Sequence, residues 1–273
     1  MASDSESNMA ERRRWNDDYW ASVWPRREVL TSAVTEILLS HLALDECERV
    51  LDIGSGGGKL TIAAGHLVGA GGSAVGVDIS APLVALARKR AADAQAGTVS
   101  FCVADAQHDT LAGGPFDVAV SQFGVMFFDE PAKAFANIRR HLVSGGRLGF
   151  ACWQAIEQNP WFVGAALASF IAAPPPPAPG KTSTGPFSLS NPRRVREILA
   201  AAGWNAPTGT ACELVARVDS DALVDDGQLA FLGVPEASFD DARRAVDEQL
   251  DPQRDSDGKI NAPLAVQIFT ATA

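Results

Sequence analysis

The 273-residue chain has no hydrophobic run that approaches the roughly 18 consecutive apolar residues of a transmembrane helix. Residues 1–14 are polar and charged and contain no apolar core, which excludes a secretory signal and predicts a disordered tail. We therefore expect a cytoplasmic protein that does not bind membranes.

Cysteine is scarce and widely spaced. The four cysteines are Cys47, Cys102, Cys152 and Cys212, and no C-x-x-C pair exists to bind a metal or carry redox chemistry. We expect reduced thiols and no metal site.

Basic residues are also few: the chain has 23 Lys and Arg and 33 Asp and Glu, which gives a formal net charge of −10. Nucleic-acid surfaces need clustered positive charge, so a nucleic-acid partner is not expected. Residues 154–273 contain neither histidine nor tyrosine. A catalytic base of either type therefore cannot come from the C-terminal half.

Glycine is concentrated in one place, where residues 50–59 read VLDIGSGGGK. A short apolar run ends at the glycines and helical spacing resumes at Leu60, which indicates a strand-to-helix turn that lets a ligand touch the backbone. Asp78 ends a second apolar run twenty residues after Gly58, where a carboxylate can bind both hydroxyls of a ribose.

Two residues argue against a dinucleotide. Lys59 takes the place of the third glycine of the G-x-G-x-x-G fingerprint, and Asp52 would repel a pyrophosphate. S-adenosylmethionine carries an ammonium and a sulfonium and no phosphate, so Asp52 attracts it instead. A nicotinamide oxidoreductase is accordingly the less favoured alternative.

The segment Asp52-x-Gly54-x-Gly56-x-Gly58 resembles motif I of class I S-adenosylmethionine-dependent methyltransferases. Three later segments are also similar to this family in order and spacing: Val103-Ala-Asp105-Ala106, residues 116–122 (FDVAVSQ), and residues 142–148 (LVSGGRL), in which Ser144 replaces the usual proline. The resemblance covers roughly residues 45–155. Within the class, the pattern is similar to the small-molecule branch that includes the ubiquinone and menaquinone biosynthesis enzymes.

Alternating apolar patterns predict the fold. Strands are expected at 49–53, 73–78, 98–103, 116–121 and 147–153, and near 208–218 and 264–271. Helices are expected at 29–42, 58–68, 81–95, 131–143, 160–173 and 191–202. The alternation predicts a Rossmann-like, doubly wound α/β sheet. The resemblance implies seven strands with the last one antiparallel.

The expected organisation has four parts. Residues 1–14 form the tail, 15–44 an N-terminal helical lid, and 45–155 the cofactor-binding core. Residues 156–273 complete the sheet and carry a helical insertion, at about 219–262, that covers the substrate. The proline run at 174–179 is expected to be an extended spacer.

The resemblance places the following residues at the cofactor: Asp52, Gly54, Ser55, Gly56, Gly58, Asp78, Ile79, Asp105, Ala106 and Ser121. We predict Gln122 and Tyr19 as catalytic residues near the transferable methyl. An apolar wall suited to an apolar or aromatic acceptor is expected from Trp20, Phe123, Met126, Phe127 and Trp153. For Trp20 and Trp24, four residues apart, a plain helical packing stripe is an equal alternative to a lid.

The resulting hypothesis is methyl transfer from S-adenosylmethionine to an oxygen or carbon nucleophile of a small, fairly apolar metabolite, leaving S-adenosylhomocysteine. Proximity and a dry site can supply most of the catalysis. The alternative is a protein of the same fold that binds the cofactor but catalyses a non-methylating reaction or acts as a binding module. We expect a monomer or a homodimer.

Overall fold

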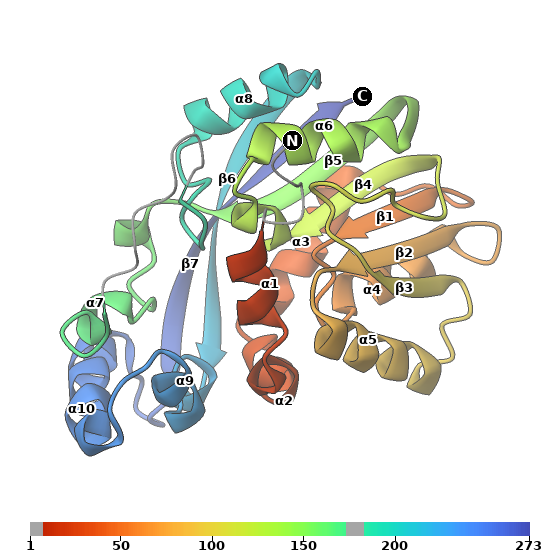
Figure 1. Cartoon of the computed structure of the whole chain (residues 1–273). Helices are drawn as coiled ribbons and strands as arrows, with labels where there is room; N and C mark the ends of the chain where they lie inside the picture. Colours follow the sequence, from red (N-terminus) through yellow and green to blue (C-terminus); the bar gives the residue numbers. More distant parts are fainter. Residues whose placement is uncertain (1–7, 173–182) are drawn as a thin grey trace.

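The computed structural model describes residues 8–172 and 183–273, and one seven-stranded sheet runs through its centre (Figure 1). In chain order the strands are β1 (Arg49–Ile53), β2 (Ser73–Asp78), β3 (Val99–Val103), β4 (Phe116–Gln122), β5 (Leu142–Trp153), β6 (Asn205–Val218) and β7 (Ile260–Thr272). All seven predicted strands are present. The largest difference is β5, which begins at Leu142 rather than at 147 because the Gly-Gly segment is already part of the strand.

The strand order is β3-β2-β1-β4-β5-β7-β6. β1 pairs in parallel with β2 on one side and with β4 on the other, whereas β7 is antiparallel to both β5 and β6. The order reverses between β1 and β4, and open α/β sheets bind ligands beyond the carboxyl ends of the strands at such a point. The predicted doubly wound sheet with an antiparallel last strand is confirmed.

Helices cover both faces of the sheet (Figure 1). They are α1 (Met9–Trp15), α2 (Asp18–Arg27), α3 (Ser32–Leu42), α4 (Lys59–Val68), α5 (Ala81–Asp93), α6 (Pro131–Arg140), α7 (Gly164–Leu167), α8 (Pro192–Ala201), α9 (Asp226–Phe231) and α10 (Phe239–Leu250). α4 packs on β1 and β2 and α5 on β3, while α8 packs on β6 and α6 on α8. No helix in the described part of the chain is long and apolar enough to cross a bilayer.

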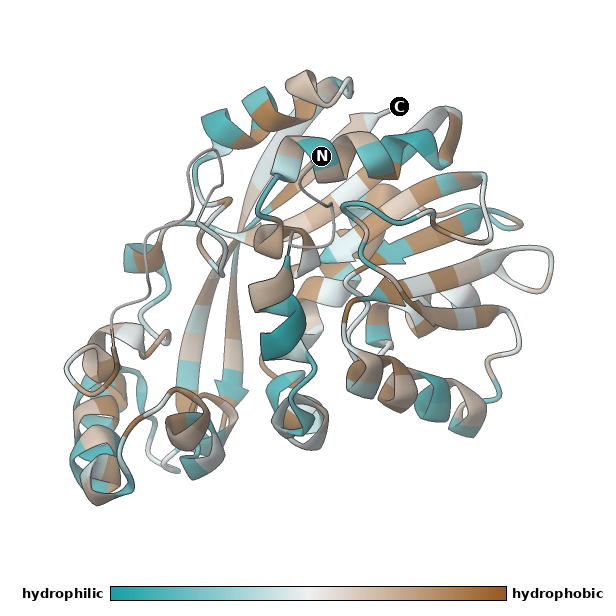
Figure 2. Cartoon of the chain, in the orientation of Figure 1, coloured by the Kyte–Doolittle hydropathy of each residue, from teal (hydrophilic) through white to brown (hydrophobic). Residues whose placement is uncertain are grey.

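The core follows from the hydropathy of the strands, which are mostly apolar between more polar helix surfaces (Figure 2). At its centre Phe150 of β5 is fully buried; its ring stacks on Phe269 of β7 at 5.4 Å and lies tilted against Phe135 of α6 at 5.3 Å. β6 lies at the edge of the sheet, and its side chains alternate between exposed and half-buried over much of its length. Alternation of this kind is typical of a strand with one solvent-facing side.

Two segments differ from the predictions. Residues 9–14, predicted as part of a disordered tail, form α1, in which Glu11 is buried. The apolar helix predicted at 160–173 is reduced to the single turn α7. The Gln249 side chain binds the backbone at Pro160, Phe162 and Ala166, so these groups have partners outside a helix.

The remaining elements follow the sequence. α9 and α10 lie between β6 and β7, where a helical insertion was predicted. α2 and α3 lie within the predicted lid segment at 15–44. The proline run at 174–179 and residues 1–7 lie outside the described residues.

Candidate active site

The glycine loop joins β1 to α4 at the carboxyl edge of the sheet. Gly54, Gly56 and Gly58 have φ of +68°, +51° and +84°, a backbone region that side chains rarely adopt. A Cβ on Gly54 would lie 2.6 Å from the Cα of Gly124, so β1 and the loop after β4 approach with backbone against backbone. The N–H groups of Gly54 and Ser55 donate to the Val77 carbonyl and fix the loop beside β2.

Asp78 ends β2 directly beside this loop. Its carboxylate accepts hydrogen bonds from the N–H of Gly56 at 2.8 Å and of Ser80 at 2.9 Å. The side chain is 8% exposed, and burial raises the pKa of Asp78 despite these donors. The carboxylate is thus held rigidly where the sequence predicts the ribose contact.

Asp52 lies under the loop and is fully buried. One carboxylate oxygen accepts a 2.6 Å hydrogen bond from the Thr61 hydroxyl, and the other has no partner among the described residues. Burial raises the pKa of Asp52 to about 7, the Thr61 hydrogen bond opposes this rise, and the nearby Asp78 adds to it. The Ser55 hydroxyl is also buried without a partner in the described structure.

These two unpartnered atoms test the expected cofactor. Buried polar groups are nearly always hydrogen-bonded, so the free oxygen of Asp52, near the end of β1, and the free hydroxyl of Ser55, in the loop after it, are groups that a bound ligand could satisfy. An ammonium group fits the free oxygen of Asp52 because it supplies both donors and positive charge. The chemistry of these residues fits S-adenosylmethionine, whose amino-acid end would meet Asp52 and Ser55 and whose ribose would meet Asp78.

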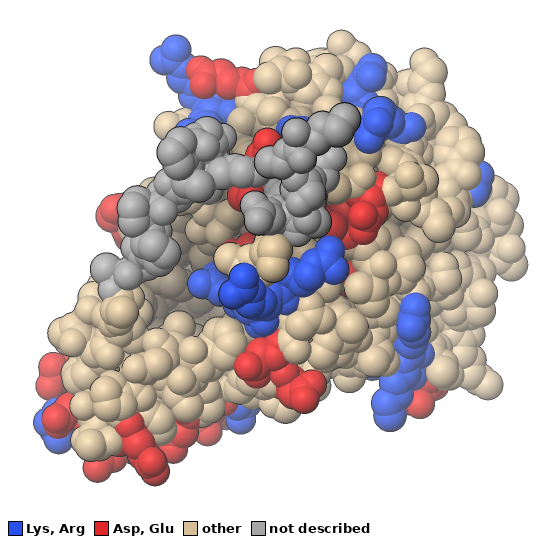
Figure 3. Space-filling model, viewed as in Figure 1, with Lys and Arg blue, Asp and Glu red and all other residues tan. Residues whose placement is uncertain are grey.

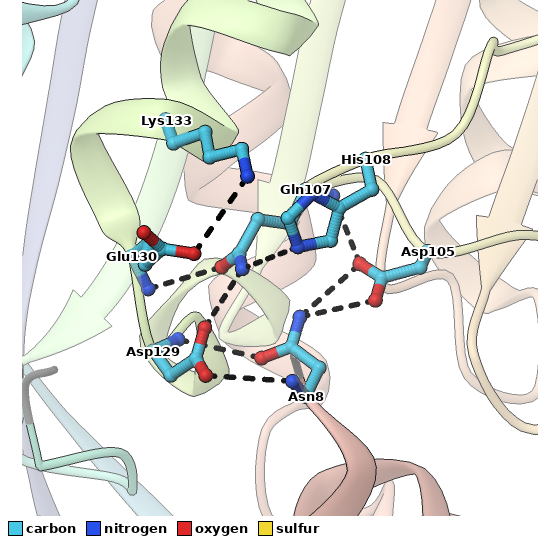
Figure 4. Close-up of polar contacts among 7 residues, drawn as sticks. All are labelled: Asn8, Asp105, Gln107, His108, Asp129, Glu130 and Lys133. Carbon is cyan, nitrogen blue, oxygen red and sulfur yellow. Dashed lines mark hydrogen bonds and ion pairs between the residues drawn. The ribbon is translucent and has the colours of Figure 1, made fainter. Parts of the chain in front are cut away.

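The segment after β3 places Asp105 and Ala106 at the next strand end, where both are buried. Asp105 Oδ1 accepts from the N–H of Gln107 at 2.9 Å. The amide of Asn8 donates to both oxygens of the same carboxylate, at 3.1 and 3.3 Å (Figure 4). Asn8 was not predicted as a site residue, because its segment was expected to be disordered.

Ser121 and Gln122, at the end of β4, are committed to other contacts. The buried Ser121 hydroxyl donates to the Ile53 carbonyl at 2.7 Å and ties β4 to β1. Gln122 accepts from the Thr35 hydroxyl at 2.7 Å and donates to the Thr31 carbonyl at 3.0 Å. Both ends of the Gln122 amide therefore hold the start of α3.

The predicted apolar wall divides into two groups. Phe123 stacks on Trp153 with ring centroids 4.2 Å apart and planes 9° apart. Phe127 meets Trp15 edge to face at 5.1 Å. Met126 is 2% exposed and belongs to the core. The structure thus pairs the wall after β4 with the end of β5 on one side and with the N-terminal helices on the other.

We call α1 and α2 together the lid, since they lie across this edge of the sheet. Trp24 sits directly on the glycine loop, because a Cβ on Gly56 would lie 2.3 Å from the Trp24 ring. Asn16 donates to the Ile79 carbonyl at 3.2 Å, and the Ser80 hydroxyl donates to the Trp15 carbonyl at 2.5 Å. The lid therefore contacts the cofactor loop and the end of β2.

Tyr19 and Trp20 connect the lid to the insertion. The Tyr19 hydroxyl donates to Asp225 at 3.1 Å, and its ring stacks on Phe231 of α9 at 5.5 Å. Trp20 lies edge to face against Phe231 at 5.2 Å, and Arg26 forms an ion pair with Asp225. Burial raises the pKa of Tyr19 to about 12, which opposes a role as a base at neutral pH.

Comparison with known proteins identifies relatives of the central segment. Residues 50–146 match the model of a family described as "Methyltransferase domain". Nocamycin O-methyltransferase of Saccharothrix syringae is 30% identical over 165 residues, covering 57% of this chain and 58% of the relative. Aklanonic acid methyltransferase DauC of Streptomyces sp. (strain C5) is 34% identical over 103 residues, covering 38% and 47%.

Ubiquinone/menaquinone biosynthesis C-methyltransferase UbiE of Stutzerimonas stutzeri is 37% identical over 101 residues, covering 37% of this chain and 40% of the relative. The chain thus spans about half the length of the curated relatives it matches. Among solved structures, the YcgJ protein of Bacillus subtilis has a TM-score of 0.60 at 18% identity, covering 88% of this chain and 98% of that one. The [4+2]-cyclase SpnF has a TM-score of 0.58 at 20% identity, covering 88% and 80%. At these identities the structural likeness shows the fold.

Proposed function

We propose that this chain, whose residues 50–146 match the model of a methyltransferase domain, is an S-adenosylmethionine-dependent enzyme that methylates an oxygen or carbon nucleophile of a small, fairly apolar metabolite. The observation that carries this proposal is the buried Asp52 carboxylate, whose free oxygen lies under the glycine loop beside Asp78. The cofactor supplies a methyl group already activated on a sulfonium. Asp52, Ser55 and Asp78 would hold its amino-acid end and ribose, and Asp105, which the resemblance places at the adenine edge, would accept from the adenine amino group. The protein has then only to bring the acceptor into line.

Proximity and exclusion of water are the proposed sources of rate. Phe123, which stacks on Trp153, and Phe127 provide an apolar surface at the end of β4 against which the acceptor would lie. An enclosed apolar site strengthens the remaining electrostatic contacts and keeps water from the reacting atoms. The Tyr19 hydroxyl donates to Asp225 and has a pKa of about 12, so Tyr19 is poorly suited to act as a general base. Methyl transfer by proximity does not require one.

The names of the relatives support the choice of acceptor class. One acts as an O-methyltransferase and another as a C-methyltransferase, which agrees with oxygen or carbon as the nucleophile. SpnF shares the fold but is named as a cyclase, so a non-methylating reaction is the alternative. Release of S-adenosylhomocysteine separates the two, because a cyclisation would not consume the cofactor.

The first test measures melting temperature with S-adenosylmethionine, S-adenosylhomocysteine and NAD. Ligand at about 100 times its Kd stabilises a fold by roughly 2.7 kcal/mol, so both adenosyl ligands should raise the melting temperature and NAD should not. S-adenosylhomocysteine release is then followed with aklanonic acid and a panel of phenols and hydroquinones. Stabilisation by NAD alone would reject the proposal, and acceptor turnover without S-adenosylhomocysteine would favour the alternative.

The proposed role of Gln122 has its own test. Because α3 holds both ends of its amide, we propose that Gln122 positions the wall rather than touching the reacting atoms. Gln122→Ala and Thr35→Val should each lower kcat/KM less than about tenfold, and together little more than either alone, since they break one contact. A fall in kcat/KM of about 100-fold or more in Gln122→Ala alone would instead support the catalytic role predicted from the sequence.

Setting and partners are also part of the proposal. The four cysteines are free, with Cys47 exposed, which suits the reducing cytoplasm. The proposed partner is the small-molecule acceptor alone, with the protein acting as a monomer or homodimer. A molar mass above that of a dimer, measured by light scattering, would contradict this proposal.

A further inference from the structure

The amide of Asn8 occupies the carboxylate that is proposed to bind adenine. Asn8 is 6% exposed and Asp105 is 4% exposed, and the amide nitrogen reaches both carboxylate oxygens. The same residue also exchanges two 3.4 Å hydrogen bonds with Asp129, one in each direction (Figure 4). Asn8 thus joins the segments that follow β3 and β4, at the start of α1.

Further along the lid, contacts continue over the rest of the proposed cofactor site. Trp15 accepts from Ser80, Asn16 donates to Ile79, and Trp24 covers Gly56. Glu28, next to α2, accepts from the Arg90 guanidinium at 2.8 Å, and Arg90 also donates to the Gly57 carbonyl at 3.0 Å. The lid therefore contacts, in order, the positions proposed for the adenine, the ribose and the amino-acid end of the cofactor.

We propose that this arrangement is a closed state in which Asn8 takes the place of the adenine amino group on Asp105, so that the cofactor binds only after α1 is released. This inference rests on the proposed function. Asn8 and adenine present the same chemical group, an N–H₂ donor, to the same carboxylate. The Asn8 amide nitrogen spans both oxygens of the Asp105 carboxylate, at 3.1 and 3.3 Å, so it occupies the side of this buried group that the adenine amino group would approach.

The structure of α1 favours its release. α1 has seven residues, too few for an independently stable helix in water, and Glu11 is its only buried residue. Arg12, Arg13 and Arg14 are exposed, and basic side chains gather on this face of the molecule over α1 (Figure 3). Besides the contacts above, Glu11 accepts a 2.6 Å hydrogen bond from the Thr184 hydroxyl. A few specific hydrogen bonds therefore determine whether α1 is closed.

The test compares Asn8→Ala and Thr184→Val with the full-length wild type, using S-adenosylhomocysteine as the ligand in calorimetry. If only molecules with α1 released can bind, the apparent Kd equals the intrinsic Kd divided by the fraction of molecules in that open state. Both variants should therefore bind more tightly, Asn8→Ala by roughly tenfold, equivalent to about 1.4 kcal/mol. Thr184→Val is the discriminating variant, because Thr184 contacts α1 and not Asp105. Melting temperatures confirm that both variants are folded.

Trypsin provides a second readout, since its potential cleavage sites at Arg12, Arg13 and Arg14 lie on α1. Saturating S-adenosylhomocysteine should speed cleavage there in the wild type, and both variants should be cut faster without ligand. Weaker or unchanged binding by Asn8→Ala, or protection of these sites by the ligand, would overturn the closed-state proposal while leaving the cofactor proposal intact. Absence of binding by all three proteins would reject both.

Discussion

Asp78→Ala is expected to weaken S-adenosylhomocysteine binding by about 100-fold, the scale of losing a buried, hydrogen-bonded charge from a binding site. The reason lies in the position of Asp78, which ends β2 beside the glycine loop and is fixed by the N–H groups of Gly56 and Ser80. Its loss removes the proposed acceptor for the ribose hydroxyls and leaves two N–H groups without their partner. Calorimetry measures the affinity, and the ligand-induced rise in melting temperature should disappear.

Two matched variants separate binding from folding. Asp78→Asn keeps the shape and one acceptor oxygen, so its affinity should fall between those of the wild type and Asp78→Ala. Asp93→Ala removes an exposed acid at the end of the following helix α5, which forms a surface ion pair with Lys89, and this variant should bind as the wild type does. Equal affinity in Asp78→Ala and Asp93→Ala, with both folded, would remove the ribose contact from the proposal.

Much of this site could be predicted because its signals are local in sequence. The bounds of β1 and β2, the three positive-φ glycines and Asp78 at a strand end all follow from periodicity and from glycine spacing. The carboxyl ends of parallel strands meet at one edge, so residues 52 to 121 could be placed together before any contact was known. Local pattern and global fold agree in this part of the chain.

The lid could not be predicted in the same way, because its partners are remote. Asn8 contacts Asp105 across 97 residues, and Tyr19 contacts Asp225 across 206. α1 is too short to give a strong helical pattern, and its polar composition resembles a free tail. A signal did exist in Glu11 and Trp15, which lie four residues apart and are hydrogen-bonded at 3.1 Å. It does not say what the helix packs against.

Distance in sequence also hid the partners of Gln122. Its position at the end of β4 was correct, yet Thr31 and Thr35 lie 91 and 87 residues away. The place of Gln122 at the carboxyl end of this strand predicts that it faces the transferable methyl. The structure adds hydrogen bonds to Thr31 and Thr35, and these contacts anchor the start of α3 to the sheet.

Asp52 should make cofactor binding depend on pH. Its pKa in the ligand-free protein is about 7, because it is buried and lies near Asp78. The ammonium of S-adenosylhomocysteine binds the charged carboxylate, so each pH unit below 7 should weaken binding by up to about tenfold. Above pH 7 the affinity should level off. Calorimetry at pH 6 in buffers of different ionisation enthalpy should show release of nearly one proton.

Stability should change with pH in the opposite direction to affinity. The pKa of Asp52 is raised from 3.8 to about 7 on folding, so the native state holds this proton more tightly than the unfolded state. The resulting stability is fully present below about pH 4 and is lost as the pH rises toward 7. Three pKa units correspond to about 4 kcal/mol. Asp52→Asn lacks this loss, so without ligand it should exceed the wild type in stability at pH 8.

Two variants test whether Asp52 is the group responsible. Asp52→Asn should bind weakly at all pH values from 5 to 8, close to the wild type at low pH. Thr61→Val removes the hydrogen bond that lowers the pKa of Asp52, and so should move the midpoint of binding to higher pH. Wild-type affinity that is constant from pH 5 to 8, or Asp52→Asn binding as tightly as the wild type, would show that this carboxylate does not meet the ammonium. The opposite trends in affinity and stability follow from one cause, since a charge buried without a full set of partners destabilises the free protein and is relieved by the cation it binds.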